Sequence, residues 1–185
     1  MERLLLITPI DGRYHSKTQI LSDYFSEYAL NFYRIKVESE YLIHLCKYKT
    51  KDFDLNVNLT KEEIHWLKSI YKEFSVIDCR RLKEIEHEIN HDVKAVEYYI
   101  REKIRDRKPE LENYVHFALT SQDINSSANM LSIKEAIEIP YDNLIQIISK
   151  NLLNISIKWK DIPILSKTHG QPASPTKFGK EIHVF

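Results

Sequence analysis

The sequence predicts an all-α protein made of long helices. Only three glycines, Gly12, Gly170 and Gly179, occur in 185 residues, which removes most of the ways to build turns with positive φ. Apolar residues recur mostly three and four positions apart, which is the spacing of one helix face. Hydrophobic residues make up 43% of the chain, so it can bury a core of its own.

Two helices are predicted before residue 76. Residues 17–48 are expected to form one long amphipathic helix, because apolar side chains recur along them with charges in between. Thr60 followed by Glu63 matches a capping box, in which the two side chains satisfy the first free N–H groups of a helix. This second helix is expected to run to about Ser75.

Two further helices are predicted before residue 109. Asp78 is expected to cap the first of them, which runs towards Asn90. The second follows directly and stops before Pro109, because a proline disfavours helical backbone in the residue that precedes it.

The C-terminal part is expected to contain a long helical stretch and a loop. Ser121 opens a helix, and Pro140 is expected to break or kink it before the apolar pattern resumes. Residues 161–175 hold three prolines and one glycine among polar residues, so they are predicted to form an extended loop. A short helix is expected after Pro175, and its apolar end without a cap indicates that the chain needs a further partner.

Composition argues against several classes of function. Basic and acidic residues both number 27, so there is no long-range field to attract nucleic acid or an anionic membrane. No segment approaches the length of a membrane span, and two cysteines, Cys46 and Cys79, are too few for a disulfide framework or a four-ligand zinc site. Without metal-ligand spacings or phosphate-binding loops, no metal or cofactor is expected. The protein is predicted to be cytoplasmic.

Three of the eight histidines, His91, His116 and His169, lie in polar segments at or near expected helix ends. The segment Thr168-His169-Gly170-Gln171-Pro172 places a hydroxyl, bare backbone and an amide beside an imidazole, which titrates near neutral pH. Such a loop is costly to order unless it has a use, so His169 is a candidate for proton transfer. Solvated or packing roles are expected for the other five: His15, His44, His65, His87 and His183.

Three other segments have both a structural and a functional interpretation. Asn90-His91-Asp92 can simply start a helix, or it can flank a titratable ring with an amide and a carboxylate. Thr120-Ser121 is a good helix start, whose hydroxyls and free N–H groups also suit a carboxylate ligand. Asp11-Gly12 is explained by turn chemistry alone. The following Arg13-Tyr14 could bind a phosphate through the planar guanidinium of Arg13 and the phenol of Tyr14.

The order and spacing of these segments resemble the adenylosuccinate lyases of the fumarase/aspartase superfamily. The resemblance covers essentially the whole chain. It rests on the following runs: Thr8-Pro9 before Asp11-Gly12-Arg13-Tyr14, Asn90-His91-Asp92-Val93-Lys94-Ala95-Val96-Glu97-Tyr98, His116-Phe117-Ala118 with Thr120-Ser121 and Asp123-Ile124-Asn125, Asp161-Ile162-Pro163, Thr168-His169-Gly170-Gln171-Pro172-Ala173 and Gly179-Lys180-Glu181. It implies an N-terminal helical domain over residues 1–111, followed over residues 112–185 by the first long helices of an incomplete helix bundle.

The resemblance also implies a reaction and a set of site residues. The reaction is the β-elimination of fumarate from adenylosuccinate, giving AMP, and from the succinylo-carboxamide ribotide of purine synthesis. His169, as the acid–base histidine, and His91 are the implied catalytic residues, and a homotetramer is the implied assembly. The residues implied to bind the nucleotide substrate are Arg13, Tyr14, Asn90, His91, Asp92, His116, Thr120, Ser121, Thr168 and Gln171.

The chain departs from this family in length. Family members are more than twice as long, and their later loop Met-Pro-x-Lys-x-Asn-Pro, which carries the proposed catalytic base, is absent here. The 185 residues alone are therefore expected to be inactive. One alternative is a short paralogue or remnant that binds a ligand or partner without catalysis. Another is a lyase for argininosuccinate or aspartate, which Arg13-Tyr14 and Asn90-His91-Asp92 disfavour.

Overall fold

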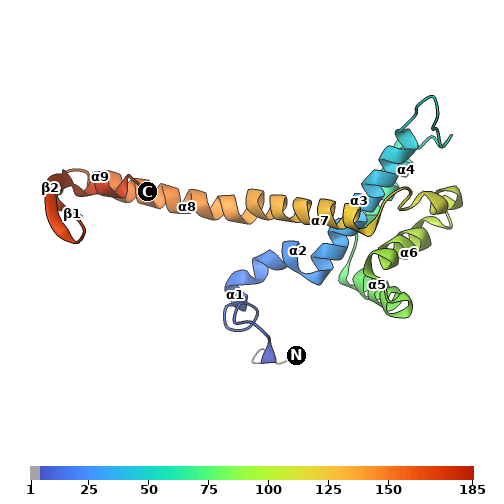
Figure 1. Ribbon diagram of the computed structural model, residues 1–185, viewed down its shortest axis with the longest axis horizontal. Coiled ribbons are helices and arrows are strands. Elements are labelled where there is room, and N and C mark those ends of the chain that lie inside the picture. Colours follow the sequence, from blue (N-terminus) through green and yellow to red (C-terminus); the bar gives the residue numbers. More distant parts are fainter. Residues whose placement is uncertain (1–4) are drawn as a thin grey trace. The chain divides into compact units, whose positions relative to one another are not determined.

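The computed structural model describes residues 5–185, which are mainly helical (Figure 1). They form two compact units, divided between Glu135 and Ala136. The predicted all-α class is confirmed, with one small two-stranded sheet added to it. The expected domain boundary at residues 111 and 112 concerns the whole protein and stays a prediction.

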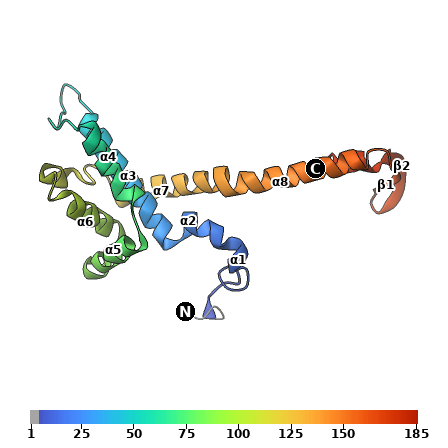
Figure 2. The ribbon, with the colours of Figure 1, turned by 180° about the vertical axis from the view of Figure 1, so that it is seen from behind.

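The first unit is built from helices, most of them joined by short connections, with a longer one over residues 48–60 between α3 and α4. In both views of the ribbon, α5 and α6 lie side by side and α4 runs beside α3 (Figures 1 and 2). Its elements are α1 (His15–Thr18), the 3-10 turn η2 (Gln19–Leu21), α2 (Ser22–Phe25), α3 (Glu27–Lys47), α4 (Lys61–Lys72), α5 (Val76–Ile89), α6 (Asp92–Ile104), the 3-10 turn η3 (Pro109–Tyr114) and α7 (Ser121–Ala136).

The predicted single helix over residues 17–48 is wrong at its N-terminal end. Ser26 has extended backbone, with φ of −75° and ψ of 165°, and interrupts the helix between α2 and α3. Its hydroxyl accepts a hydrogen bond from the N–H of Ala29 and so caps α3. A capping serine within the apolar pattern therefore starts a new helix.

The caps of the next two helices agree only in part with the prediction. Thr60 and Glu63 form the predicted capping box of α4, which is confirmed, although α4 already ends at Lys72. The expectation that Asp78 caps α5 is wrong, because Ser75 is the N-cap and Asp78 is its partner three residues on. The left-handed backbone of Asn90 ends α5 where predicted.

The core of the first unit lies between α3, α4, α5 and α6. Fully buried side chains from each of the four helices meet there, among them Leu42, Leu67, Leu82 and Tyr99. A smaller cluster joins α3 to α7 through Ala29, Tyr33 and Ala128. These contacts fix α3, α6 and α7 relative to one another, and the starts of α6 and α7 carry part of the candidate site.

The second unit joins two helices to a β-hairpin. A π-helical turn, η4 (Ile137–Tyr141), contains Pro140, where a break or kink was predicted. It leads into α8 (Asp142–Lys158), the strands β1 (Pro163–Thr168) and β2 (Gln171–Lys177), and the short helix α9 (Phe178–Ile182) (Figure 1). No helix among residues 5–185 is long and apolar enough to cross a membrane.

The extended loop predicted for residues 161–175 is instead an antiparallel hairpin. Thr168 pairs with Gln171 across a two-residue turn, and both turn residues have positive φ, 51° at His169 and 76° at Gly170. The prolines did not prevent pairing, because in a sheet of two strands each strand is an edge and can leave an N–H unused.

Candidate active site

The start of α6 carries His91 as its N-cap. His91 Nδ1 accepts a hydrogen bond of 3.2 Å from the N–H of Lys94. The structural interpretation of this segment is therefore confirmed. Because Nδ1 uses its lone pair in this contact, the proton of the neutral ring is on Nε2, and the side chain is half exposed. A fixed N–H donor is thus presented at the beginning of α6.

A buried arginine joins this helix start to the next one. Arg34, on α3, donates through Nη2 to Asp92 at 2.6 Å and through Nε to Asn125 of α7 at 2.9 Å. Burial alone would raise the pKa of Asp92, but the N–H of Val93 and the charge of Arg34 outweigh it and lower the pKa. Asp92 is therefore an anion at neutral pH.

His116 bridges two buried carboxylates. Its Nδ1 lies 2.5 Å from Glu38 of α3, and its Nε2 lies 3.8 Å from Glu97 of α6. Burial raises the pKa of Glu38, and the hydrogen bond to His116 offsets only part of that rise. The backbone of His116 has a φ of 64°, a costly conformation for a residue with a side chain. His116 is thus held by its neighbours, with only 13% of its side chain exposed.

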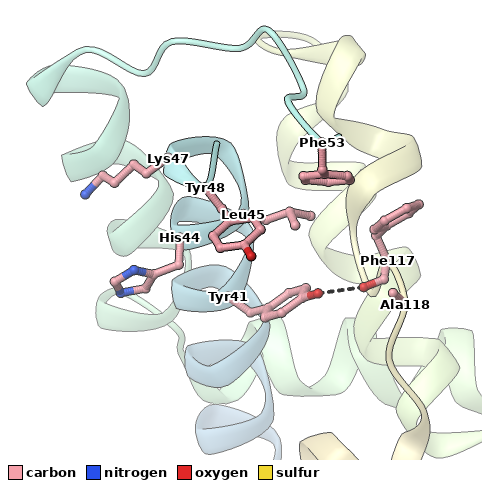
Figure 3. A pocket seen from close by; sticks show the side chains of 8 residues that line it. All are labelled: Tyr41, His44, Leu45, Lys47, Tyr48, Phe53, Phe117 and Ala118. Atoms are coloured by element: carbon pink, nitrogen blue, oxygen red, sulfur yellow. Dashed lines mark hydrogen bonds between the residues drawn. The ribbon is translucent and has the colours of Figure 1, made fainter. Parts of the chain in front are cut away.

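Phe117 continues this strained segment into an apolar pocket of about 540 Å³. The hydroxyl of Tyr41 donates to the carbonyl of Phe117 at 2.8 Å, and the next residue, Ala118, also has positive φ. Figure 3 shows the rings of Phe53 and Phe117 facing Tyr41 and Leu45, with Tyr41 bonded to the Phe117 carbonyl. The pocket wall and His116 therefore belong to one connected segment.

The start of α7 is formed by Thr120 and Ser121. The N–H and the hydroxyl of Thr120 both donate to Asp123, at 2.7 and 3.0 Å, and the first of these bonds lowers the pKa of that carboxyl. Ser121 forms no side-chain hydrogen bond within residues 5–185. Its hydroxyl is therefore available beside the free N–H groups of a helix N-terminus.

The turn that contains Arg13 and Tyr14 precedes α1. The Arg13 guanidinium carbon lies 5.5 Å from the centre of the Tyr14 ring, a cation–π arrangement. Thr8 donates to Asp11 at 3.1 Å and so closes the turn, as turn chemistry predicts. In the described part of the chain, neither Arg13 nor Tyr14 forms a hydrogen bond or ion pair with the other candidate residues.

Thr168, His169 and Gln171 belong to the second unit, at the tip of its hairpin. All three are exposed, and His169 occupies the first position of the turn. The structure therefore joins Asp92, through Arg34, to the start of α7, and places His116 between α3 and α6. Within residues 5–185, no group of three or more histidine, cysteine or acidic side chains is placed so that it could hold a metal ion.

Sequence reasoning gave no site role to three residues of this arrangement, namely Arg34, Glu38 and Asn125, although Asn125 lies in one of the matched runs. Arg34 and Glu38 are charged residues one helical turn apart on α3, and both are buried. The available signal was this spacing of four, which places two charges on one face among apolar neighbours. Polar residues between apolar ones were instead assumed to face solvent.

Comparisons of sequence show which proteins this chain resembles. A family model described as lyase matches residues 12–185. Adenylosuccinate lyase from Dictyostelium discoideum is 47% identical over 100% of this chain, and the Vibrio cholerae and Escherichia coli K12 enzymes of that name are 40% and 39% identical over 98% of it. The chain spans about 40% of the length of each of these relatives.

Comparisons of structure show a shared fold. A β-carboxy-cis,cis-muconate cycloisomerase from Acinetobacter calcoaceticus sp. ADP1 matches 89% of this chain with a TM-score of 0.63 and 18% identity. The Pseudomonas putida 3-carboxy-cis,cis-muconate lactonizing enzyme matches 89% of it with a TM-score of 0.57 and 15% identity. The chain covers 36% and 35% of these two structures.

Proposed function

The chain belongs to the lyase family, and on this premise we propose that it forms the N-terminal part of an adenylosuccinate lyase. The observation that carries the proposal is 47% identity to the Dictyostelium enzyme over the whole of this chain. The proposed reaction is the elimination of fumarate from adenylosuccinate, which yields AMP, and from the succinylo-carboxamide ribotide of purine synthesis. The nucleotide is bound without a cofactor.

The elimination creates negative charge next to a carboxylate. A base removes a proton from the carbon beside the carboxylate, the C–N bond breaks, and the departing nitrogen takes up a proton. Preorganised donors are needed where this charge develops. The start of α7 supplies them through its N–H groups and the hydroxyl of Ser121, which has no hydrogen-bond partner within residues 5–185, with Thr120 beside it. This helix start is assigned to the carboxylate end of the substrate.

The other proposed contacts follow from charge and donor type. Arg13 and Tyr14 offer a guanidinium and a phenol to the phosphate of the nucleotide. His91 presents its Nε2–H from a fixed helix start, while Asn90 and Asp92 flank it and His116 lines the site. His91 is therefore assigned a donor role in catalysis.

His169 is assigned the proton transfer to the departing nitrogen. Its ring is exposed at the tip of the hairpin, where Thr168 and Gln171 pair directly below it and add a hydroxyl and an amide. An imidazole can both donate and accept a proton, which suits this step. The base that removes the carbon-bound proton is assigned to the part of the relatives' length that this chain does not span.

The proposed working form is a cytoplasmic homotetramer of longer chains, to which the 185 residues contribute part of each site. Within the second unit, α8 exposes apolar side chains around much of its surface. They include Leu144, Ile145, Ile147, Ile148, Leu153 and Ile157. A surface of this kind supports burial against further protein, as in a helix bundle. The isolated chain is accordingly expected to release no fumarate.

The proposal is tested with a chimera in which this chain replaces the matching segment of the Dictyostelium enzyme. We expect the chimera to release fumarate from adenylosuccinate and the 185 residues alone to release none. A folded, inactive chimera would instead favour the alternative, a short paralogue or remnant that binds without catalysis. Circular dichroism and light scattering, compared with the Dictyostelium parent, establish whether the chimera is folded and assembled.

Replacing His169 by Gln in the chimera tests its role directly. Loss of the proton donor should lower kcat by about 100-fold or more, with little change in thermal stability, because the side chain is exposed. His183→Gln, an exposed histidine of the same unit, is the matched control and should leave kcat unchanged. A near-normal kcat for His169→Gln would remove His169 from the mechanism.

A further inference from the structure

Arg34 is a buried cation whose three nitrogens are all partnered. Its side chain is 7% exposed. Nη2 donates to Asp92 at 2.6 Å, Nε to Asn125 at 2.9 Å, and Nη1 to Asn31 at 3.5 Å. Removing a partner from a buried charge is expensive, so these contacts restrain the residues that make them.

Two of the three contacts lead to the helix starts of the candidate site. Asp92 is the first residue of α6 and directly follows its cap, His91. Asn125 lies four residues after Ser121 on α7, and residues four apart share a helix face. Asn31 lies on α3 itself, so the third contact leads to neither helix start.

We propose that Arg34 is a positioning residue that fixes the starts of α6 and α7 relative to each other, so that His91 and Ser121 hold one substrate between them. This inference rests on the proposed function, because it takes these two segments as substrate contacts. Arg34 itself is buried and acts on the substrate through Asp92 and Asn125.

The chemistry of the guanidinium explains why an arginine is needed. Its planar fork directs donors along fixed angles, so acceptors on two different helices are held at one separation and one orientation. An ammonium is a compact point charge on a flexible stem and cannot span both acceptors in this way. Arg34→Lys therefore keeps the charge and loses the coupling between the two helix starts.

The coupling is tested by hydrogen exchange on the 185-residue chain. In Arg34→Lys, we expect faster exchange in both helix starts, at the amides of residues 93–96 and 123–126. Asn31→Ala removes the contact that leads to neither helix and should leave both segments as protected as in the original chain. Faster exchange at only one helix start, or equal effects of the two variants, would overturn the proposed coupling between the helix starts.

The consequence for the substrate is tested in the chimera. Asn125→Ala leaves Nε without its acceptor, and we expect the KM for adenylosuccinate to rise about tenfold, the factor that one hydrogen bond to a charged group represents, while kcat changes little. Asn125→Asp keeps an oxygen acceptor and should restore KM. Asn31→Ala is the matched control and should leave KM and kcat unchanged.

The outcomes separate this inference from the proposed function. An inactive but folded chimera contradicts the proposed function, whereas the exchange experiment still decides whether Arg34 couples the two helix starts. If the chimera is active but Asn125→Ala and Asn31→Ala give the same KM, Arg34 has only a structural role and the positioning role is wrong. A rise in KM confined to Asn125→Ala, reversed in Asn125→Asp, supports it.

Discussion

His91 combines a cap with a proposed chemical role, and two substitutions separate them. In His91→Ala the N–H of Lys94 loses its acceptor at 3.2 Å. Losing an N-cap costs about 1 kcal/mol, and with a slope of about 2 kcal/mol per molar urea the unfolding midpoint should fall by about 0.5 M. His91→Asn keeps an acceptor of the preferred type, so its midpoint should stay close to that of the original chain.

Activity should follow a different order. Neither variant retains the imidazole Nε2–H, so in the chimera both should release fumarate about 100-fold more slowly. Urea unfolding of the 185-residue chain and initial rates of the chimera measure the two effects independently. If His91→Asn kept the original kcat/KM, the ring would have no chemical role, and if His91→Ala unfolded at the original urea concentration, the cap would contribute nothing.

Two further predictions concern stability. Burial alone would raise the pKa of Asp78, but hydrogen bonds from Lys103, Ser75 and Tyr99 hold this pKa well below its unfolded value of about 3.9. The ionised Asp78 therefore stabilises the fold fully above about pH 3.9, and this stabilisation is lost as the pH falls through the folded pKa. Asp78→Asn should cost about 2 kcal/mol at pH 7 and flatten the loss of stability in acid; an acid limb as steep as the original would contradict this. A Cβ at Gly179 would collide with the backbone of Ser156 and lie 2.5 Å from Lys160 Cα, so Gly179→Ala should destabilise the second unit by about 2 kcal/mol. A Cβ at Gly170 would meet no atom within 4 Å, so Gly170→Ala should cost only the strain of a positive φ, about 1 kcal/mol. Thermal unfolding of both variants is followed by Trp159 fluorescence in a Trp66→Phe background. Equal losses of stability in the two variants would contradict the argument.

Much of the helical framework could be predicted because it depends on local patterns. The capping box at Thr60 and the end of α5 at Asn90 follow from side chains within one helical turn of each other. Ser26 was missed because a serine inside an apolar pattern is compatible with a continuous helix until its hydroxyl is seen to cap Ala29.

The buried polar contacts of the site could not be predicted in the same way. Arg34 and Asn125 are 91 residues apart, and only the packing of α3 against α7 brings them together. The hairpin was missed for a related reason. Prolines indicate that a segment is not a strand unless the strand is at the edge of its sheet, and the sequence does not show that this sheet has only two strands, both of them edges. Motifs identified most of the candidate residues, whereas tertiary structure supplied the residues that hold them.

The two-residue turn between β1 and β2 restricts how this segment can evolve. Successive side chains of a strand point to opposite faces, so inserting or deleting one residue in the turn would shift the pairing of Thr168 with Gln171. One of the two side chains would then turn away from the face that it now shares with the other. Surface connections usually tolerate changes of length, but here we expect homologous chains to vary in residue type and to keep the spacing around His169 constant.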